Sequence, residues 1–158
     1  MIATTITPST EATHGYLGRV ALQAAGKPQD HKERIRQELK DLGMWRPGLL
    51  RPEARYLPNI IHPDEAIEAI VYGHNEEGLV MLVATDRRAI YLNKKPLFLD
   101  EDQVTYDVVL GIDYYSVGPY TTVTLRTQIK DFKVKTCNKA CAEAFVDYIE
   151  SHCLDRKA

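Results

Sequence analysis

The feature that most constrains the fold is a succession of short β-type segments between about residue 65 and residue 134. Apolar, β-branched and aromatic residues form short runs, and turn residues such as Gly, Asn, Asp and Pro separate them. Dense strands joined by short turns predict an antiparallel meander of about seven strands, either a sandwich or a barrel. The expected strand segments are residues 66–72, 79–85, 89–93, 97–99, 104–106, 112–117, 121–125 and 132–134.

One helical segment follows the last strand, and Asn138 is a suitable N-cap for it. The helical segment carries an apolar stripe, and such a stripe can close the open end of a barrel that is too short to fill itself. Within the strands, the apolar run 79–84 favours a central strand covered on both faces. Thr85 and Asp86 are expected to hold the next turn by bonding nearby backbone N–H groups. The stripe of the C-terminal segment consists of Cys141, Phe145, Tyr148, Ile149 and His152.

Residues 1–50 are predicted to be an N-terminal tail with a helical extension, and residues 51–158 to be the β-rich domain. Residues 17–24 have helical spacing, and a second helix over 31–42 is expected to start at Asp30 and to end at Gly43. A short helix is expected to begin near Pro52. The 31–42 helix carries an apolar stripe of three residues, too narrow to keep a helix folded alone in water. It must therefore dock on the following domain or on a second chain.

Two stretches of sequence, together with the order of elements, resemble the bacterial pleckstrin-homology-like (PH-like) domain family. Residues 57–59 (LPN) with 64–67 (DEAI) resemble its opening segment, and residues 78–91 (GLVMLVATDRRAIY) resemble its central hairpin with a Thr-Asp-x-Arg turn. The resemblance covers roughly residues 57–153. It implies an α+β fold: a PH-like antiparallel β-barrel or sandwich of about seven strands closed by a C-terminal helix, with an N-terminal helical extension.

Four basic residues at the ends of the expected strand 89–93 are candidates for binding phosphate or an acidic partner: Arg87, Arg88, Lys94 and Lys95. Such a strand spans about 16 Å, so the two pairs are expected to lie apart, and charged residues are ordinary at hairpin ends. In eukaryotic PH-like proteins, inositol phosphates often bind basic residues of the first strand pair and its loop. Here the corresponding loop, residues 73–78, contains Glu76 and Glu77, which disfavours phosphoinositides.

A non-catalytic PH-like module that mediates protein–protein contacts or self-association is the first functional hypothesis. Peripheral binding to anionic lipid or a phosphate-bearing ligand through the four basic residues is the alternative. An unrecognised enzyme with a site in the barrel mouth ranks third, because no catalytic signature is found. Ordinary β-propensity also explains the tyrosines of the candidate interface. The candidate interface residues are Ile35, Leu39, Leu42, Trp45, Tyr114, Tyr115 and Tyr120.

Several other classes of protein are disfavoured. A net charge of −2 removes the electrostatic case for nucleic acid, and the longest uncharged apolar run, residues 79–84, is far shorter than the roughly 20 residues that span a bilayer. The Thr-rich, uncharged residues 1–8 lead us to expect no secretory leader. No cofactor is expected, because neither a Walker A motif nor a Gly-rich dinucleotide pattern occurs.

Three cysteines, Cys137, Cys141 and Cys153, form a poor disulfide framework and suggest a reducing cytoplasm. No metal site is expected. Three turns of a straight helix separate the cysteine pair from His152 and Cys153, a distance of about 16 Å, so these groups cannot converge on one ion. The acidic residues 100–102 are interpreted as a solvated edge that discourages sheet-to-sheet aggregation.

Overall fold

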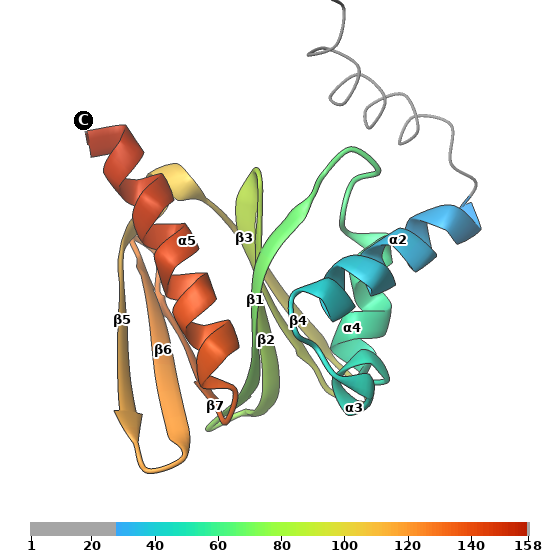
Figure 1. Cartoon of the computed structure of the whole chain (residues 1–158), viewed down its shortest axis with the longest axis horizontal. Helices are drawn as coiled ribbons and strands as arrows, with labels where there is room; N and C mark the ends of the chain where they lie inside the picture. Colours follow the sequence, from blue (N-terminus) through green and yellow to red (C-terminus); the bar gives the residue numbers. More distant parts are fainter. Residues whose placement is uncertain (1–27, 158) are drawn as a thin grey trace, which may run out of the picture.

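Seven strands form one antiparallel sheet in the computed structural model, which describes residues 28–157 (Figure 1). The strands follow the order β4-β3-β2-β1-β7-β6-β5, so β4 and β5 are the two edges. The sheet curls into a half-barrel, and the predicted antiparallel meander with a closing C-terminal helix is confirmed. The strands are Ile67–Asn75 (β1), Gly78–Thr85 (β2), Arg88–Lys94 (β3), Leu99–Thr105 (β4), Val109–Val117 (β5), Tyr120–Thr127 (β6) and Asp131–Thr136 (β7).

The two halves of the sheet meet where β1 passes close to β7. These two strands share the register pair His74↔Lys135, whereas β1 pairs with β2 along most of its length. A Cβ atom added to Gly73 would lie 2.0 Å from the carbonyl oxygen of Lys135. Only a residue without a side chain lets the two backbones approach this closely. The join between the halves of the half-barrel therefore depends on Gly73.

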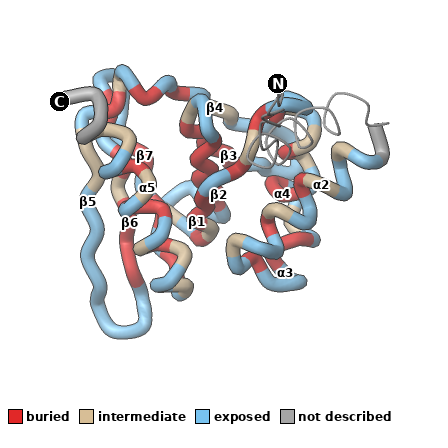
Figure 2. Tube along the Cα trace, turned by 45° about the horizontal axis from the view of Figure 1, so that its top comes forward, coloured by how far each residue is buried: buried red, intermediate tan, exposed pale blue. Residues whose placement is uncertain are grey.

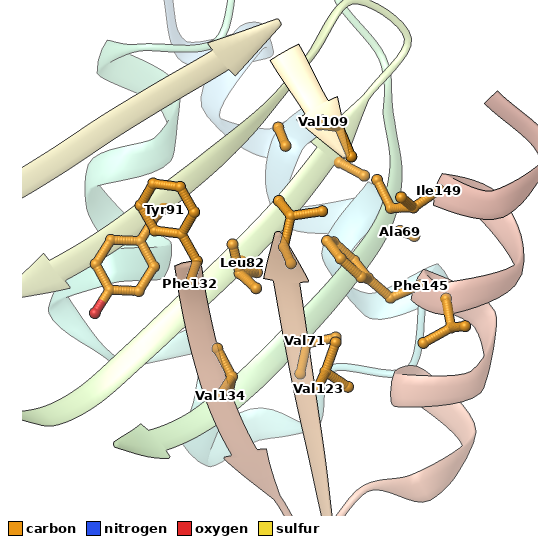
Figure 3. Close-up of a cluster of buried hydrophobic side chains, with 14 of the residues drawn as sticks. Ala69, Val71, Leu82, Tyr91, Val109, Val123, Phe132, Val134, Phe145 and Ile149 are labelled. Carbon is orange, nitrogen blue, oxygen red and sulfur yellow. The ribbon is translucent and has the colours of Figure 1, made fainter. Parts of the chain in front are cut away.

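The inner face of the sheet packs against α5 (Lys139–Lys157), as Figure 3 shows. Phe145 and Ile149 of this helix are fully buried among side chains from both halves of the sheet, and Tyr148 packs partly against the same core. These three positions of the predicted stripe are confirmed. The Asn138 side-chain oxygen accepts a hydrogen bond from the Cys141 N–H at 3.1 Å, so the predicted N-cap is also confirmed. Cys141 itself points elsewhere, because its Sγ donates to the Leu42 carbonyl oxygen at 3.3 Å.

The outer face of β1–β3 is covered by N-terminal helices α2 (Pro28–Asp41), α3 (Arg46–Leu49) and α4 (Pro52–Tyr56), as Figures 1 and 2 show. Ile35 and Leu39 of α2 are each 1% exposed. They pack in a second core with side chains of these strands, among them Ile70 of β1 and Met81 of β2. This helix was expected to dock on the following domain or on a second chain, and in the structure it docks on the chain's own sheet. Strand β2 is therefore buried on both faces, as the sequence predicted.

The limits of the N-terminal helices differ in part from the prediction. α2 begins at Pro28, so Asp30 lies in its first turn instead of capping it. The helix ends as expected, because Gly43 has a φ of +96° and the Met44 N–H bonds back to the Leu39 carbonyl oxygen at 2.9 Å. The expected helix at Pro52 is α4. The four-residue α3 was not predicted, because one helical turn has no periodicity to detect. The expected helix over 17–24 and the tail before it lie outside the described residues.

Two predictions about the strands are corrected. Residues 97–99 and 104–106 are not separate strands; the acidic residues between them belong to one strand, β4. Carboxylates are tolerated there because β4 is an edge strand; Asp100 is exposed, and Glu101 and Asp102 are partly exposed. The interpretation of residues 100–102 as an acidic edge is confirmed, whereas their protection against aggregation stays a prediction. The loop expected over 73–78 is also shorter, since Gly73 and His74 lie in β1 and only Glu76 and Glu77 form the turn.

Candidate functional site

Arg88, one of the candidate binding residues, forms a buried bidentate ion pair with Glu65. Its Nε and Nη2 lie 2.9 Å from Oε1 and Oε2 of Glu65, whose side chain is 0% exposed. Nη2 of Arg88 also donates to the Ile60 carbonyl oxygen at 2.9 Å. The guanidinium is only 16% exposed, so it is engaged inside the chain. Sequence reasoning assigned no role to Glu65, although the residue lies in the stretch that resembles the family's opening segment.

The Thr-Asp-x-Arg turn between β2 and β3 is tied to the segment before β1. Thr85 Oγ1 accepts hydrogen bonds from the N–H groups of Arg87 and Arg88 at 3.1 Å and donates to Glu65 Oε1 at 2.7 Å. Asp86 Oδ1 accepts from the Ala66 N–H at 3.1 Å. The prediction that Thr85 and Asp86 bond backbone N–H groups is confirmed. The β2–β3 turn therefore fixes the position of the residues that lead into β1.

The ionisation of Glu65 follows from its partners. Burial raises the pKa of Glu65, but hydrogen bonds from Arg88, Thr85 and the His62 N–H outweigh burial and hold the pKa below its usual value. Nearby, the Tyr148 hydroxyl donates to the Thr85 carbonyl oxygen at 3.1 Å, and burial raises the pKa of Tyr148 to about 12. The carboxylate is thus charged and the phenol protonated at neutral pH.

The other three basic candidates lie at two separated places. Arg87 forms an exposed ion pair with Asp64 at 2.5 Å, and hydrogen bonding within this pair lowers the pKa of Asp64. Lys94 and Lys95 lie at the opposite end of β3, roughly 20 Å away for a strand of this length. The Lys94 ammonium stands 5.3 Å from the centre of the Tyr56 ring. Arg87 and Arg88 therefore lie at one end of β3, and Lys94 and Lys95 lie at the other end, as the strand length predicted.

The predicted interface residues also divide into groups. Ile35 and Leu39 are buried against the chain's own sheet, and Leu42 packs partly against the same core. Trp45, in contrast, is 72% exposed at the start of α3. The helix stripe is thus covered within the chain, and the exposed candidates are Trp45 and the three tyrosines.

The tyrosines lie on the β5–β6 hairpin, which projects beyond the rest of the sheet and is exposed toward its tip (Figures 1 and 2). Tyr114 and Tyr115 are neighbours in β5, so their side chains point to opposite faces of the sheet. They are 47% and 57% exposed. Tyr120 begins β6, and the Lys135 ammonium lies 4.5 Å from its ring centre. The free edge of β5 therefore carries an aromatic side chain on each face.

The two edges of the sheet differ in charge. β5 has nine residues, of which only Asp113 is charged, and that carboxylate pairs with Arg126 of β6 at 2.6 Å. β4 carries three consecutive acidic residues, and one of them, Asp102, pairs with Lys130 at 2.6 Å. Charged edges resist the addition of a further strand, whereas apolar and uncharged edges accept one. β5 is therefore the edge with less charge to oppose the addition of a strand.

Metal sites and membrane-spanning helices are both absent from the described part of the chain. No group of three or more His, Cys, Asp and Glu side chains within residues 28–157 is placed to hold a metal ion. In the same part of the chain, every helix is too short or too polar to cross a membrane. The three cysteines are free thiols, and burial raises the pKa of Cys141.

Comparison with known proteins gives one family match. A family model described as "Bacterial PH domain" matches residues 61–151, more than half of the chain. A solved structure from Shewanella loihica PV-4, described as a DUF1696 family protein with a pleckstrin-homology domain, is 14% identical, with a TM-score of 0.45. That match covers 64% of this chain and 93% of the other. The comparison with curated proteins finds no match.

Proposed function

The chain belongs to the bacterial PH domain family, and on that premise we propose that it is a non-catalytic interaction module that binds protein, including a second copy of itself. The observation that carries the proposal is the open edge of β5. PH-like domains are generally binding modules, and the described residues bring together no group of His, Cys, Asp and Glu side chains that could hold a metal ion.

The mechanism of binding is the addition of a strand to β5. An edge strand presents unpaired N–H and C=O groups, and these give affinity when an extended segment pairs with them. β5 contains neither Lys nor Pro, the two residues that most often protect an edge. Tyr114 and Tyr115 would contact the added strand on its two faces, and tyrosine is enriched in interfaces. A second copy can offer its own β5, which would continue the sheet across a twofold axis.

Light scattering coupled to size-exclusion chromatography tests this proposal with the variant Tyr115→Lys. A monomer has a mass of 17.9 kDa. We expect the unmodified chain to have a larger mass that rises with concentration. Tyr115→Lys should shift it toward the monomer, because a charged side chain, lysine above all, protects an edge strand from pairing with another strand.

The matched control is Leu97→Lys, which places the same charge at an exposed apolar position in the turn between β3 and β4. This control should keep the mass of the unmodified chain. A monomeric unmodified chain at high concentration would contradict self-association. Equal loss of mass in both variants would contradict the assignment to β5.

Peripheral binding to anionic lipid is the second candidate, and one observation favours it. Lys94 and Lys95 precede Leu97 and Phe98, which are 86% and 72% exposed in the turn between β3 and β4. Exposed apolar side chains beside lysines suit an anionic membrane surface. Arg87 and Arg88 support this candidate less, because both are paired with carboxylates.

The phosphoinositide version of this candidate has weaker support. Beside the turn between β1 and β2 lies a cavity of about 630 Å³ whose lining has more carboxylates than basic groups. Glu76 and Glu77 form its rim, and such a site repels a polyphosphate. Sedimentation with phosphatidylcholine vesicles, with and without phosphatidylglycerol, tests the lipid candidate. Salt-sensitive binding that Lys94→Gln weakens would support it, and equal sedimentation with both vesicles would contradict it.

A further inference from the structure

A groove of about 560 Å³ lies between the N-terminal helices, β1 and the start of α5. Four separate parts of the chain form its wall: the turn from α2 to α3, Arg51 between α3 and α4, the strand pair β1–β2, and the connection from β7 into α5. Figure 1 shows the helices α3 and α5 on either side of the β1–β2 hairpin. The volume lies within the range of about 300–1,000 Å³ that is usual for small-molecule sites.

Residues from the N-terminal part of the chain and from the PH domain together line the groove. Met44, Trp45 and Arg51 line it but precede residue 61, where the family match begins. The hydrogen bond from Cys141 Sγ to the Leu42 carbonyl oxygen, at 3.3 Å, joins the two sides across 99 residues. The family fold alone would therefore lack one wall of this groove.

One part of the wall is apolar. Met44 and Ile70 are buried at its base, while Trp45 and Leu79 are 72% and 39% exposed at its rim. An indole this exposed beside a cavity gains from contact with an apolar ligand, because both lose surface to water. The groove can thus hold a hydrocarbon or aromatic body.

The charged part of the wall has one sign. Arg51, Lys135 and Lys139 are the charged residues that line the groove, and no aspartate or glutamate lines it. Lys139 pairs with Glu143 of its own helix at 3.6 Å. The charges of Arg51 and Lys135 face aromatic rings, at 5.6 Å from the centre of Tyr72 and 4.5 Å from that of Tyr120. Among the described residues, neither of them has a carboxylate within ion-pair distance. Each is therefore available to pair with an anion from solution.

From this combination we infer that the groove binds a small amphiphilic anion, with one alkyl or aromatic body and one carboxylate group. The apolar part of the wall favours a ligand with an alkyl or aromatic body, and the basic part of the wall favours a ligand with a negative charge. The volume favours a small molecule over a second copy of the chain. This site is separate from the β5 edge and does not depend on the proposed interaction with protein.

Trp45 provides a direct test, because it is the chain's single tryptophan and lies in the wall of the groove. Its fluorescence is followed while decanoate is added below the concentration at which it forms micelles. We expect a saturable shift of the emission to shorter wavelength as the ligand displaces water from the indole. Decanol, a neutral molecule of equal chain length, should bind at least about tenfold more weakly, because a charge-assisted contact is lost.

Matched variants locate the anion. Lys135→Gln and Arg51→Gln should each weaken decanoate binding by about tenfold. Lys133→Gln, two residues earlier on β7 and outside the groove, should leave it unchanged. Lys94→Gln should also have no effect, which separates this site from the lipid candidate. A fluorescence change that does not saturate, equal binding of decanol, or binding that is unaltered in both Lys135→Gln and Arg51→Gln would each overturn the inference.

Discussion

At the scale of single residues, Arg87 and Arg88 are adjacent and carry the same charge, yet the fold gives them different roles. Arg87 pairs with Asp64 in solvent, whereas Arg88, 16% exposed, pairs with the fully buried Glu65. An exposed pair contributes roughly 0–1 kcal/mol to the free energy of unfolding. Removing one partner of a buried pair costs about 3–5 kcal/mol, because the other charge is left unpaired. Neighbouring carboxylates should therefore respond very differently to the same substitution.

Glu65→Gln should lower the free energy of unfolding by about 3 kcal/mol, since it leaves the Arg88 guanidinium without its counter-charge. Asp64→Asn is the matched control and should change this free energy by less than about 1 kcal/mol. Urea denaturation at pH 7 measures both. Similar losses in the two variants would contradict the contrast between the buried and the exposed pair.

The stability of the unmodified chain should also fall with acid in a way that depends on Glu65. The pKa of Glu65 in the folded chain is below its usual value of 4.5. Its contribution is complete above that value and is lost as the pH falls through the lower folded pKa. The difference in stability between the unmodified chain and Glu65→Gln should therefore narrow below about pH 4.5. Denaturant titrations across the acid range measure this difference in the free energy of unfolding. A difference that stays constant with pH would contradict the lowered pKa of Glu65.

At the scale of elements, β1 is the strand on which both cores depend. Val71 points into the inner core with α5, and Ile70 points into the outer core with α2. The same strand pairs with β2 on one side and reaches β7 on the other. Gly73 lies where β1 passes the Lys135 carbonyl group. Because this join is made by backbone atoms, no side-chain movement can relieve a clash there.

Gly73→Ala should destabilise the chain by at least about 2–3 kcal/mol, because the added methyl group forces β1 away from β7. Gly111→Ala in β5 is the matched control, since no atom lies within 4 Å of the position of its Cβ. The control should stay within about 1 kcal/mol of the unmodified chain. Thermal unfolding followed by circular dichroism compares the two, and equal melting temperatures would contradict the role given to Gly73.

At the scale of the whole molecule, the predicted division at residues 50 and 51 stays a proposal. The family match begins at residue 61, which is consistent with a domain in the second part of the chain. However, Ile35 and Leu39 share the outer core with β1–β3. We propose that residues 51–158 hold the family fold and that residues 28–50 act as its permanent cover.

A fragment of residues 51–158 tests this proposal against a control that starts at residue 28. The fragment should unfold at lower denaturant concentration and should associate further than the control, because the outer face of β1–β3 loses its apolar cover. The control keeps the outer core and should match the full chain in stability. A monomeric fragment as stable as the control would show that α2 is not a necessary cover.

Local periodicity in the sequence was sufficient for much of the fold. Short β-type runs separated by turn residues located the strand meander, the continuous apolar run 79–84 predicted the burial of β2 on both faces, and three consecutive carboxylates predicted the acidic edge in β4. Helical spacing located α5 and its cap at Asn138. These features depend on residues within a few positions of one another, which is why a pattern can report them. The same reasoning misplaced the start of α2 and divided β4, because element boundaries depend on contacts from outside the segment.

Only the tertiary structure decided which charges and which apolar residues are available to a ligand. Arg88 meets Glu65 across 23 residues, and the Cys141 thiol meets Leu42 across 99. No local pattern encodes such pairings, since they depend on the path of the whole chain. Both candidate arginines pair with carboxylates of a distant segment, and the groove beside Trp45 is formed by segments that are far apart in the sequence. Sequence by itself determined the elements and the family; the packing of distant segments determined the surfaces that remain free to bind.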